Sequence, residues 1–312
     1  MNQIFLKINA LCTVLLFAST AACFAGEESR VEVKGHSQVV PLPVSHTFYD
    51  GKFLFSDKTS IECDMPDIAE YFLMRIGELG ELPSGSENTI NIDIDPSSAL
   101  PAEGYVLDIH SDTIYIQAKD RGGAIYAIET LMQLIPAEEY VRSDRSRLAV
   151  QCQRVEDYPR YPYRGAHLDV ARTFSDKNTV MRFIDNMARH KFNRFHWHLT
   201  DDEGWRIEIK AFPELTSIGG YRGGDSPVPP RYASLDKKYG GYFTQDEIRE
   251  VVEYAAFRNI EIIPEIDLPG HSLAATKVIP GVICPNSGNV EIWKRNVWCA
   301  TREENYAILD SI

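Results

Sequence analysis

The sequence predicts a small α+β domain followed by a parallel α/β unit. Up to about residue 150, short strand patterns mix with helical patterns, and from about Tyr163 the order becomes strand, loop, helix, repeated. Each strand of the second part ends in a group of polar residues. In a (β/α)₈ barrel such strand ends form one rim, which carries the active site. The second part is therefore either an open parallel sheet or part of a barrel.

The N-terminal residues have the features of a targeting segment. Lys7 precedes an apolar run over Leu11–Ala18, which is too short to span a bilayer, and small residues follow through Ala25. We expect residues 1–25 to be a signal peptide and the mature chain to be exported, to a periplasmic, secreted or lysosomal destination. A lipoprotein signal that ends at Cys23 is the alternative, although Thr20 stands where such a signal usually has an apolar residue. No later run predicts a transmembrane helix.

Composition restricts the class of partner. The 312 residues are 44% hydrophobic, which is enough for one large domain or two smaller ones, and the formal net charge is −13. A polyphosphate is repelled by this charge, so no nucleic acid partner is expected. A neutral substrate is not affected by it.

Four cysteines remain after the predicted signal peptide. In an exported protein an even number favours disulfides over metal ligation. Cys284 and Cys299 would close a loop of about fifteen residues, for which chain entropy gives roughly 3 kcal/mol. Cys63 and Cys152 are the other two, and the alternative to the disulfide is two unpaired buried thiols.

The first domain is expected over 30–155 and shows no obvious catalytic group. Alternation at period two predicts a strand over Thr89–Asp95, and Tyr105–Ile109 and Thr113–Ala118 flank a short turn, which predicts a hairpin. Helical spacing of apolar residues follows over Gly122–Ile135.

The second domain is expected over 160–312. Its predicted elements are, in order, a strand at Arg164–Val170, a helix capped by Asp176 and running to about His190, a strand at Phe192–Leu199, a helix opened by a capping box at Thr244–Glu247, and a strand at Asn259–Asp267. A last helix is expected over Glu303–Ile312. Only about three such units fit into the roughly 150 residues present, whereas eight need roughly 250.

Two strand ends carry the candidate functional residues. The first holds three adjacent acids, Asp201 to Glu203, with tryptophans nearby that could stack on a sugar ring. The alternative is a solvated acidic turn with the tryptophans in the core. The second holds Glu265 and Asp267, and a turn rich in proline and glycine could bring His271 back across the rim.

No metal or organic cofactor is expected from these residues. His196 and His198 flank Trp197 and face the same side of a strand, but the sequence offers no evident third ligand.

Four motifs in order resemble the signatures of glycoside hydrolase family 20, the β-N-acetylhexosaminidases. They are RGAHLDVARTF, FHWHLTDDEGWRIEI, GYFTQDEI and IIPEIDLPGH, between Arg164 and His271. The preceding domain, which ends in GAIYAIETLMQLI, resembles the non-catalytic domain of this family. The resemblance implies an α+β N-terminal domain followed by an incomplete (β/α)₈ TIM barrel.

The resemblance also implies a mechanism, because this family is a substrate-assisted exception among glycosidases. The 2-acetamido oxygen of the substrate attacks the anomeric carbon, a glutamic acid protonates the leaving oxygen and an aspartate orients the acetamido nitrogen. Asp201 and His271 are then expected to pair behind the acid, and Arg164 to bind hydroxyls of the terminal sugar. Four further residues are expected around the substrate: Asp202, Trp205, Glu265 and Asp267.

The chain departs from the family pattern at its end. In the family, the acid/base pair lies in a His-x-Gly-Gly-Asp-Glu type segment. The chain shows no such segment up to Ile312, and Asp202-Glu203 belongs to a different motif. Residues 1–312 alone are therefore expected neither to close a barrel nor to hydrolyse substrate. The complete protein is expected to act on N-acetylglucosamine- or N-acetylgalactosamine-terminated glycans or chitin oligomers and could form a homodimer.

Two other functions fit the residues. One is a non-catalytic N-acetylglucosamine-binding protein that uses Arg164. The other is a different hydrolase with Glu265 and Asp267 as its carboxylates, which would cleave glycosides that lack the acetamido group.

Overall fold

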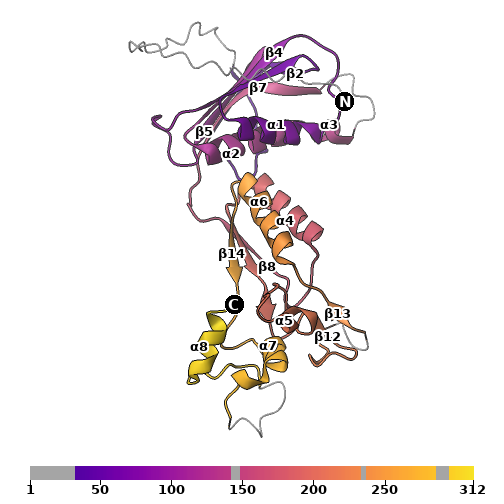
Figure 1. Cartoon of the computed structure of the whole chain (residues 1–312). Helices are drawn as coiled ribbons and strands as arrows, with labels where there is room; N and C mark the ends of the chain where they lie inside the picture. The colour runs from indigo at the N-terminus through magenta and orange to yellow at the C-terminus, as the bar shows by residue number, and fades with distance from the viewer. Residues whose placement is uncertain (1–31, 142–147, 233–236, 286–294) are drawn as a thin grey trace. The chain divides into compact units, whose positions relative to one another are not determined.

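The computed structural model describes residues 32–141, 148–232, 237–285 and 295–312, and the chain divides into two compact units between Pro162 and Tyr163 (Figure 1). This division lies close to the junction expected from the sequence. The predicted signal peptide, with Cys23, falls outside the described residues. Among the helices that are described, none has the length and apolar character needed to cross a membrane.

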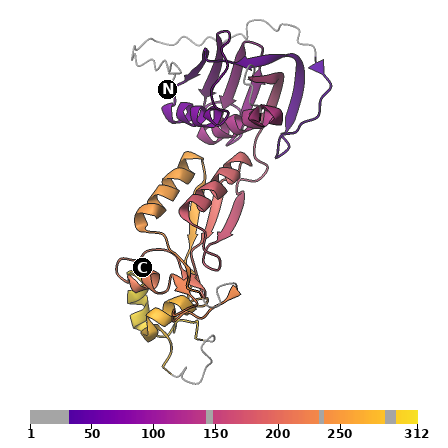
Figure 2. The same ribbon diagram turned by 90° about the vertical axis from the view of Figure 1, so that its right-hand side faces the viewer.

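The first unit is a seven-stranded mixed sheet with helices on one face (Figures 1 and 2). The strands lie in the order β1-β2-β7-β5-β6-β4-β3. Their bounds are β1 Glu32–Val33, β2 Ser45–Phe55, β3 Thr59–Cys63, β4 Asn88–Ile94, β5 Tyr105–Ile109, β6 Thr113–Ala118 and β7 Leu148–Asp157. The helices are α1 Pro66–Gly77, α2 Arg121–Leu134 and the short α3 Ala137–Val141.

The local predictions for this unit are confirmed. β5 and β6 pair antiparallel, with Ile109 opposite Ile114 across the turn, as expected for the hairpin. The start of α2 is fixed by Asp120, whose side chain accepts a hydrogen bond from the backbone N–H of Gly123 at 2.9 Å. Burial of the apolar residues of α2 against the sheet then completes the core of the unit.

The second unit is built on three parallel strands. These are β8 Gly165–Asp169, β9 Arg194–His198 and β14 Glu261–Glu265, in the spatial order β14-β9-β8. Helices α4 Lys177–Arg189 and α6 Gln245–Phe257 pack against each other and share one core with the sheet (Figure 1). Three parallel strands joined through helices correspond to the first part of a (β/α)₈ barrel.

The predicted helix starts of this unit are confirmed. The Asp176 side chain accepts from the N–H of Thr179 at 2.8 Å, and Thr244 and Glu247 form the reciprocal capping box. These contacts satisfy backbone donors that a helix leaves unpaired at its N-terminus.

Short elements fill the connections after β9 and after β14. They are β10 Thr200–Asp201, β11 Gly204–Trp205, α5 Glu214–Ser217, β12 Tyr221–Arg222, β13 Tyr239–Gly240, α7 Leu273–Val278, the 3₁₀ turn η2 Pro280–Val282 and α8 Glu303–Leu309. A second apolar cluster, which includes Trp205, Leu215 and Trp298, packs these segments together. The last helix ends at Leu309, three residues before the expected Ile312.

The side chain of Arg206 links the loop that follows β8 to the segments that follow β9. It is fully buried and donates to the carbonyl oxygens of Val170 at 3.0 Å and Ala171 at 2.6 Å. It also donates to the carbonyls of Gly220 and Gly241. Burial and the nearby charge of Arg222 lower the pKa of Arg206 to about 10, so the group remains a cation at neutral pH.

The expected disulfide between Cys284 and Cys299 is present, at a sequence separation of 15 residues. Cys63 and Cys152 do not take part in a disulfide within the described residues; the first is half-buried and the second buried. The described part of the chain therefore combines one disulfide with two cysteine thiols.

Replacing both Cys284 and Cys299 with serine is expected to lower the free energy of unfolding by about 3 kcal/mol, because the disulfide restricts the unfolded chain. Urea unfolding without reductant measures the change. A Cys63→Ser variant is the control and should unfold at the wild-type urea concentration. Equal midpoints for the double variant and the wild type would contradict the prediction.

Candidate active site

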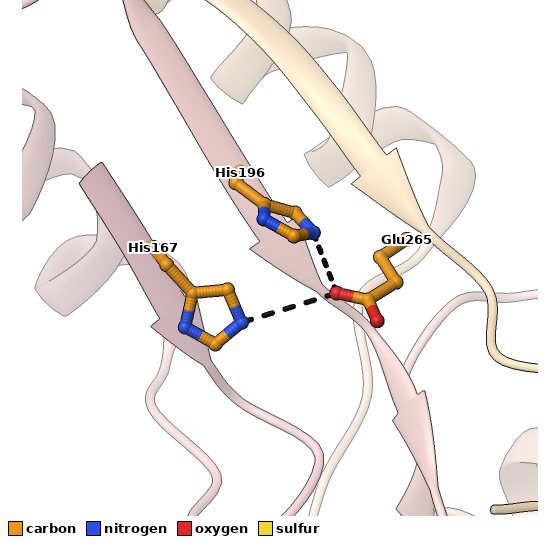
Figure 3. Close-up of side chains that lie close together, drawn as sticks. All are labelled: His167, His196 and Glu265. Carbon is orange, nitrogen blue, oxygen red and sulfur yellow. Dashed lines mark ion pairs between the residues drawn. The ribbon is translucent and has the colours of Figure 1, made fainter. Parts of the chain in front are cut away.

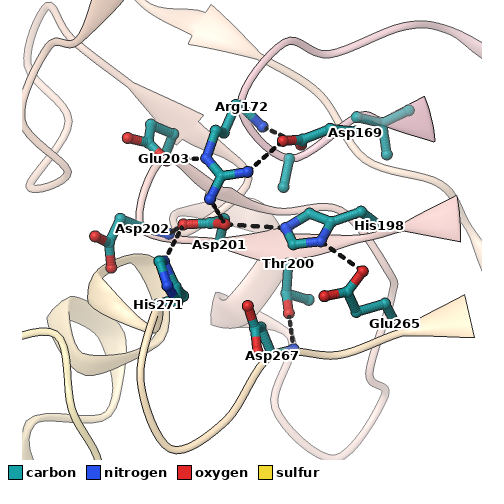
Figure 4. A network of polar contacts seen from close by, with 12 residues as sticks. Asp169, Arg172, His198, Thr200, Asp201, Asp202, Glu203, Glu265, Asp267 and His271 are labelled. Carbon is teal, nitrogen blue, oxygen red and sulfur yellow. Dashed lines mark hydrogen bonds and ion pairs between the residues drawn. The ribbon is translucent and has the colours of Figure 1, made fainter. Parts of the chain in front are cut away.

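The carboxyl ends of the three strands meet at one edge of the sheet (Figure 4). Asp169 lies opposite His198 in the β8–β9 register, and His198 lies opposite Glu265 in the β9–β14 register. In a parallel sheet all strand ends of one kind share an edge, so this register brings two carboxylates and an imidazole together.

Asp201 is the centre of the polar network. Its side chain is about 1% exposed, and its Oδ2 lies 2.9 Å from His198 Nε2 and 2.6 Å from Arg172 Nη2. Its Oδ1 lies 3.2 Å from His271 Nδ1 and accepts from the N–H of Asp202 at 2.6 Å (Figure 4). Burial raises the pKa of Asp201, but these hydrogen bonds and the positive charge of Arg172 outweigh burial and lower it. Asp201 is therefore a carboxylate at neutral pH.

His198 is held between two carboxylates. Its Nε2 faces Asp201, and its Nδ1 lies 2.7 Å from Oε2 of Glu265. Burial lowers the pKa of His198, but the contacts with Asp201 and Glu265 outweigh burial and raise the pKa to about 9. For Glu265, burial raises the pKa, and the contacts with His198 and His196 outweigh burial and lower it. A cationic ring thus separates two ionised acids.

His271 reaches Asp201 through the turn that follows β14. The backbone of His271 has φ of 51°, a region that residues with a side chain seldom adopt. The turn is held by the N–H of Asp267, which donates to Thr200 Oγ1 at 2.8 Å, and by the Ser272 hydroxyl, which donates to the carbonyl of Gly270 at 2.6 Å. The imidazole is 56% exposed, so one side faces Asp201 and the other can meet a substrate or another proton carrier.

The remaining predicted acids lie in or beside the network. Asp202 is buried; its Oδ1 accepts from the N–H of Leu273, the first residue of α7, and its Oδ2 from the Asn296 side chain, both at 3.0 Å. Asp202 therefore joins the β9 end to the segment after β14. Carboxylate oxygens of Asp201 and Asp267 lie within 4.8 Å of a His198 nitrogen and of each other.

The structure does not bring Arg164 to this edge. Arg164 precedes β8, at the end of the strand opposite to Asp169, and its Nε donates to the carbonyl of Lys191 at 2.7 Å. The guanidinium at the network is that of Arg172, which lies 2.6 Å from Asp169 Oδ2 and is 36% exposed. The two arginines lie at opposite ends of β8, so Arg164 does not reach the network. The Asp-x-x-Arg spacing from Asp169 was the local signal for Arg172.

Trp205 is also placed differently from the expectation. Its side chain is 1% exposed, its indole N–H donates to the carbonyl of Ile207 at 2.8 Å, and it packs in the second apolar cluster. A ring that is covered on both faces cannot stack on a sugar, so Trp205 belongs to the core. Trp197 is likewise fully buried, between the sheet and the helices.

Glu203, the third of the adjacent acids, had no expected role but lies in the site. It is 2% exposed, and its Oε1 lies 2.8 Å from Arg231 Nη1. Its other oxygen lies 3.8 Å from Nε of Arg172. Arg231 follows a long irregular connection, so no sequence spacing pointed to this pair.

Comparison with known proteins agrees with this architecture. Residues 36–158 match domain 2 of glycosyl hydrolase family 20, and residues 161–312 match its catalytic domain. A β-hexosaminidase of Vibrio furnissii is 38% identical over 88% of this chain and 45% of its own length. One of Porphyromonas gingivalis is 37% identical over 88% of this chain and 36% of its own length.

Solved structures show the same correspondence. The exo-β-N-acetylglucosaminidase of Vibrio harveyi superposes with a TM-score of 0.79 at 34% identity, over 91% of this chain and 46% of that one. The N-acetyl-β-hexosaminidase of Streptomyces plicatus gives a TM-score of 0.73 at 29% identity, over 88% of this chain and 55% of that one. The chain thus spans about half the length of the relatives that it matches.

The matches to both domains, together with parallel strands whose carboxyl ends carry acids and histidines, place the chain among the glycoside hydrolases with a (β/α)₈ catalytic domain. Within this class, the chain belongs to glycoside hydrolase family 20 and contains its domain 2 and the first part of its catalytic barrel.

Proposed function

We propose that this chain supplies the sugar-binding and proton-relaying half of an enzyme that hydrolyses terminal non-reducing N-acetylhexosamine residues from N-acetyl-β-hexosaminides. The observation that carries the proposal is the contact of 3.2 Å between buried Asp201 and exposed His271 at the carboxyl edge of the sheet. This pairing leaves one face of the imidazole available to a general acid.

The proposed reaction is substrate-assisted and retaining. The acetamido oxygen of the substrate forms a bond to the anomeric carbon while the glycosidic bond breaks, and the leaving oxygen takes a proton from a glutamic acid. We place that glutamic acid, and the aspartate that orients the acetamido group, beyond Ile312. His271, oriented by ionised Asp201, is the group that would set the proton affinity of the glutamic acid.

Arg172 takes the place in this proposal that the sequence resemblance gave to Arg164. Its guanidinium is partly exposed at the edge where Asp169 and Asp201 orient it. A planar group with several donors is suited to two neighbouring sugar hydroxyls. We propose neutral substrates, N-acetylglucosamine- or N-acetylgalactosamine-terminated glycans or chitin oligomers, for an exported enzyme.

Residues 1–312 alone are expected to hydrolyse p-nitrophenyl N-acetyl-β-glucosaminide no faster than the buffer, because we place the general acid outside them. A chain continued through the Asp-Glu segment is expected to be active, and its His271→Ala variant should lose about 10²–10⁴-fold in kcat. Release of p-nitrophenol measures both. Activity of purified 1–312 that disappears with His271→Ala would overturn this assignment.

A non-catalytic sugar-binding protein is the second candidate, favoured by the partly exposed Arg172 beside buried carboxylates. It requires calorimetric binding of N-acetylglucosamine to 1–312 that Arg172→Met weakens and the control Arg164→Met does not. No heat of binding would remove this candidate. A hydrolase that uses Glu265 and Asp267 instead requires cleavage of a glycoside that lacks the acetamido group.

A further inference from the structure

The two acids in the turn between β10 and β11 are buried, although acidic residues in turns normally face solvent. Asp202 and Glu203 connect the paired residues Asp201 and Gly204, and their exposed fractions are 7% and 2%. Each oxygen of Asp202 accepts a hydrogen bond. Oε2 of Glu203 is also buried, but it accepts none within the described residues. A buried carboxylate oxygen without a donor is unfavourable, so a function should account for it.

The other oxygen of Glu203 is anchored by the connection that follows β11. Oε1 lies 2.8 Å from Nη1 of Arg231, whose side chain is 38% exposed. The buried Arg222 donates to the carbonyl oxygen of Arg231 at 3.2 Å and to that of Arg172 at 2.7 Å. Arg222 thus ties together the backbones of the two arginines that face the Glu203 carboxylate.

Oε2 of Glu203 faces Arg172 (Figure 4). It lies 3.8 Å from Nε of Arg172, while Nη1 lies 2.6 Å from Asp169 Oδ2 and Nη2 lies 2.6 Å from Asp201 Oδ2. Each of the three guanidinium nitrogens therefore has a carboxylate of its own. Each of these contacts needs one N–H group, so Nη1 and Nη2 both keep a second donor.

Glu265, another acid at this edge of the sheet, contacts histidines instead (Figure 3). Its Oε2 lies 2.6 Å from His196 Nε2, 3.9 Å from His167 Nε2 and 2.7 Å from His198 Nδ1. Glu265 thus belongs to the histidines of the network, and Glu203 is the acid that faces the Nε edge of Arg172.

We propose that Glu203 is a positioning residue for Arg172, anchored by Arg231 and acting on the Nε edge of the guanidinium. The inference rests on the proposed function, in which Arg172 binds two neighbouring hydroxyls of a terminal N-acetylhexosamine. These are the hydroxyls on C3 and C4, because C1 carries the glycosidic bond and C2 the acetamido group.

The geometry of Arg172 explains how Glu203 acts. A charge-assisted contact between nitrogen and oxygen is about 2.7–2.9 Å long, so a movement of Nε by roughly 1 Å brings it onto Oε2 of Glu203. A guanidinium held at three nitrogens keeps one direction for its two remaining N–H groups, and small errors in such a direction are costly for catalysis.

The complete protein, continued through the Asp-Glu segment, tests the proposal. Glu203→Gln keeps an acceptor for Arg231 but removes the charge that faces Arg172, and it should lower kcat/KM for p-nitrophenyl N-acetyl-β-glucosaminide about tenfold or more. In an Arg172→Met background the same change should alter kcat/KM by no more than about twofold, because its partner is absent.

A second readout is the preference of the enzyme for this substrate over its 4-deoxy analogue, given by the ratio of the two kcat/KM values. Glu203→Gln should lower this ratio about threefold or more, since Arg172 then holds the hydroxyl less well. The ratio does not depend on the fraction of folded protein, so a merely structural role would leave it unchanged.

Glu208→Gln is the matched control. Glu208 lies in the same connection, and its Oε2 accepts from the N–H of Gln245 at 2.9 Å, so this variant alters a carboxylate contact away from Arg172 and should keep the wild-type ratio. Arg231→Gln removes the anchor at a partly exposed side chain and should lower the ratio as Glu203→Gln does. Thermal unfolding shows whether each variant is folded.

An active wild type whose Glu203→Gln and Arg231→Gln variants keep the wild-type ratio would overturn this inference and leave the proposed function in place. So would a loss of kcat/KM that is equally large in the Arg172→Met background. A complete protein without activity towards either substrate would instead remove the proposed function, and this inference with it.

Discussion

Asp201→Ala is expected to lower the free energy of unfolding of the second unit by about 3–5 kcal/mol. The carboxylate is buried and is shared by Arg172, His198 and His271, so its loss removes one negative partner from each cation and leaves the N–H of Asp202 without its acceptor. Leaving a buried charge uncompensated is far more destabilising than losing an exposed ion pair. Urea unfolding followed by tryptophan fluorescence measures the change.

Asp246→Ala is the matched control. The Asp246 side chain is 92% exposed and contacts Arg249 on the surface of α6, so the variant should stay within about 0.5 kcal/mol of the wild type. Asp201→Asn keeps the shape of the side chain and should fall between the two. If Asp201→Ala is as stable as the control, the network is not what holds the strand ends together.

The same carboxylate predicts a dependence on acid. The pKa of Asp201 is lower in the folded chain than the unfolded value of about 3.9, so its contribution to stability is complete above that value and is lost as the pH falls through the folded pKa. Between pH 5 and pH 2, by titration of unfolding free energy, the wild type should therefore lose more stability than Asp201→Asn. Parallel curves for the two proteins would contradict this.

Arg206→Met is expected to destabilise the second unit by about 3 kcal/mol or more. Methionine keeps the apolar stem but removes the donors to the carbonyls of Val170 and Ala171 on one side and of Gly220 and Gly241 on the other. A buried carbonyl that loses its donor costs about 1–3 kcal/mol. Chemical unfolding gives the magnitude, and hydrogen exchange should show faster exchange in the two joined connections.

Arg249→Met is the control, at a guanidinium that is 60% exposed and pairs with Asp246. It should change the free energy of unfolding by no more than about 0.5 kcal/mol. An Arg206→Met variant as stable as this control would show that relief from burying a cation balances the lost hydrogen bonds.

Elements with a strong local signal were predictable. The capping box at Thr244, the Asp176 cap and the hairpin at Tyr105–Ile109 all depend on residues within a few positions of one another, and the structure reproduces each. The boundaries moved by one to three residues, because strand ends are decided by pairing with neighbours. The third strand is an example: the apolar run from Asn259 suggested an earlier start than Glu261, where pairing with Arg194 begins.

The site was predictable only in part. The turn between Pro269 and His271 indicated that His271 could point back across the rim, and the family resemblance implied Asp201 as its partner, which it contacts. The choice between Arg164 and Arg172 depended on which end of β8 faces the site, and the burial of Trp205 depended on segments far along the chain. No local pattern contains either fact.

The sequence by itself determined the two-part organisation, the family resemblance, the helix caps and the residues of the Asp201–His271 pair, since these depend on short-range spacing and on motif order. Only the tertiary structure decided which arginine joins the network, that Glu203 pairs with Arg231, and that His167 and Glu265 lie beside His196. The reason is the parallel register: it places side chains from β8, β9 and β14 in one layer across nearly a hundred residues of sequence, and register is set by long-range pairing and packing.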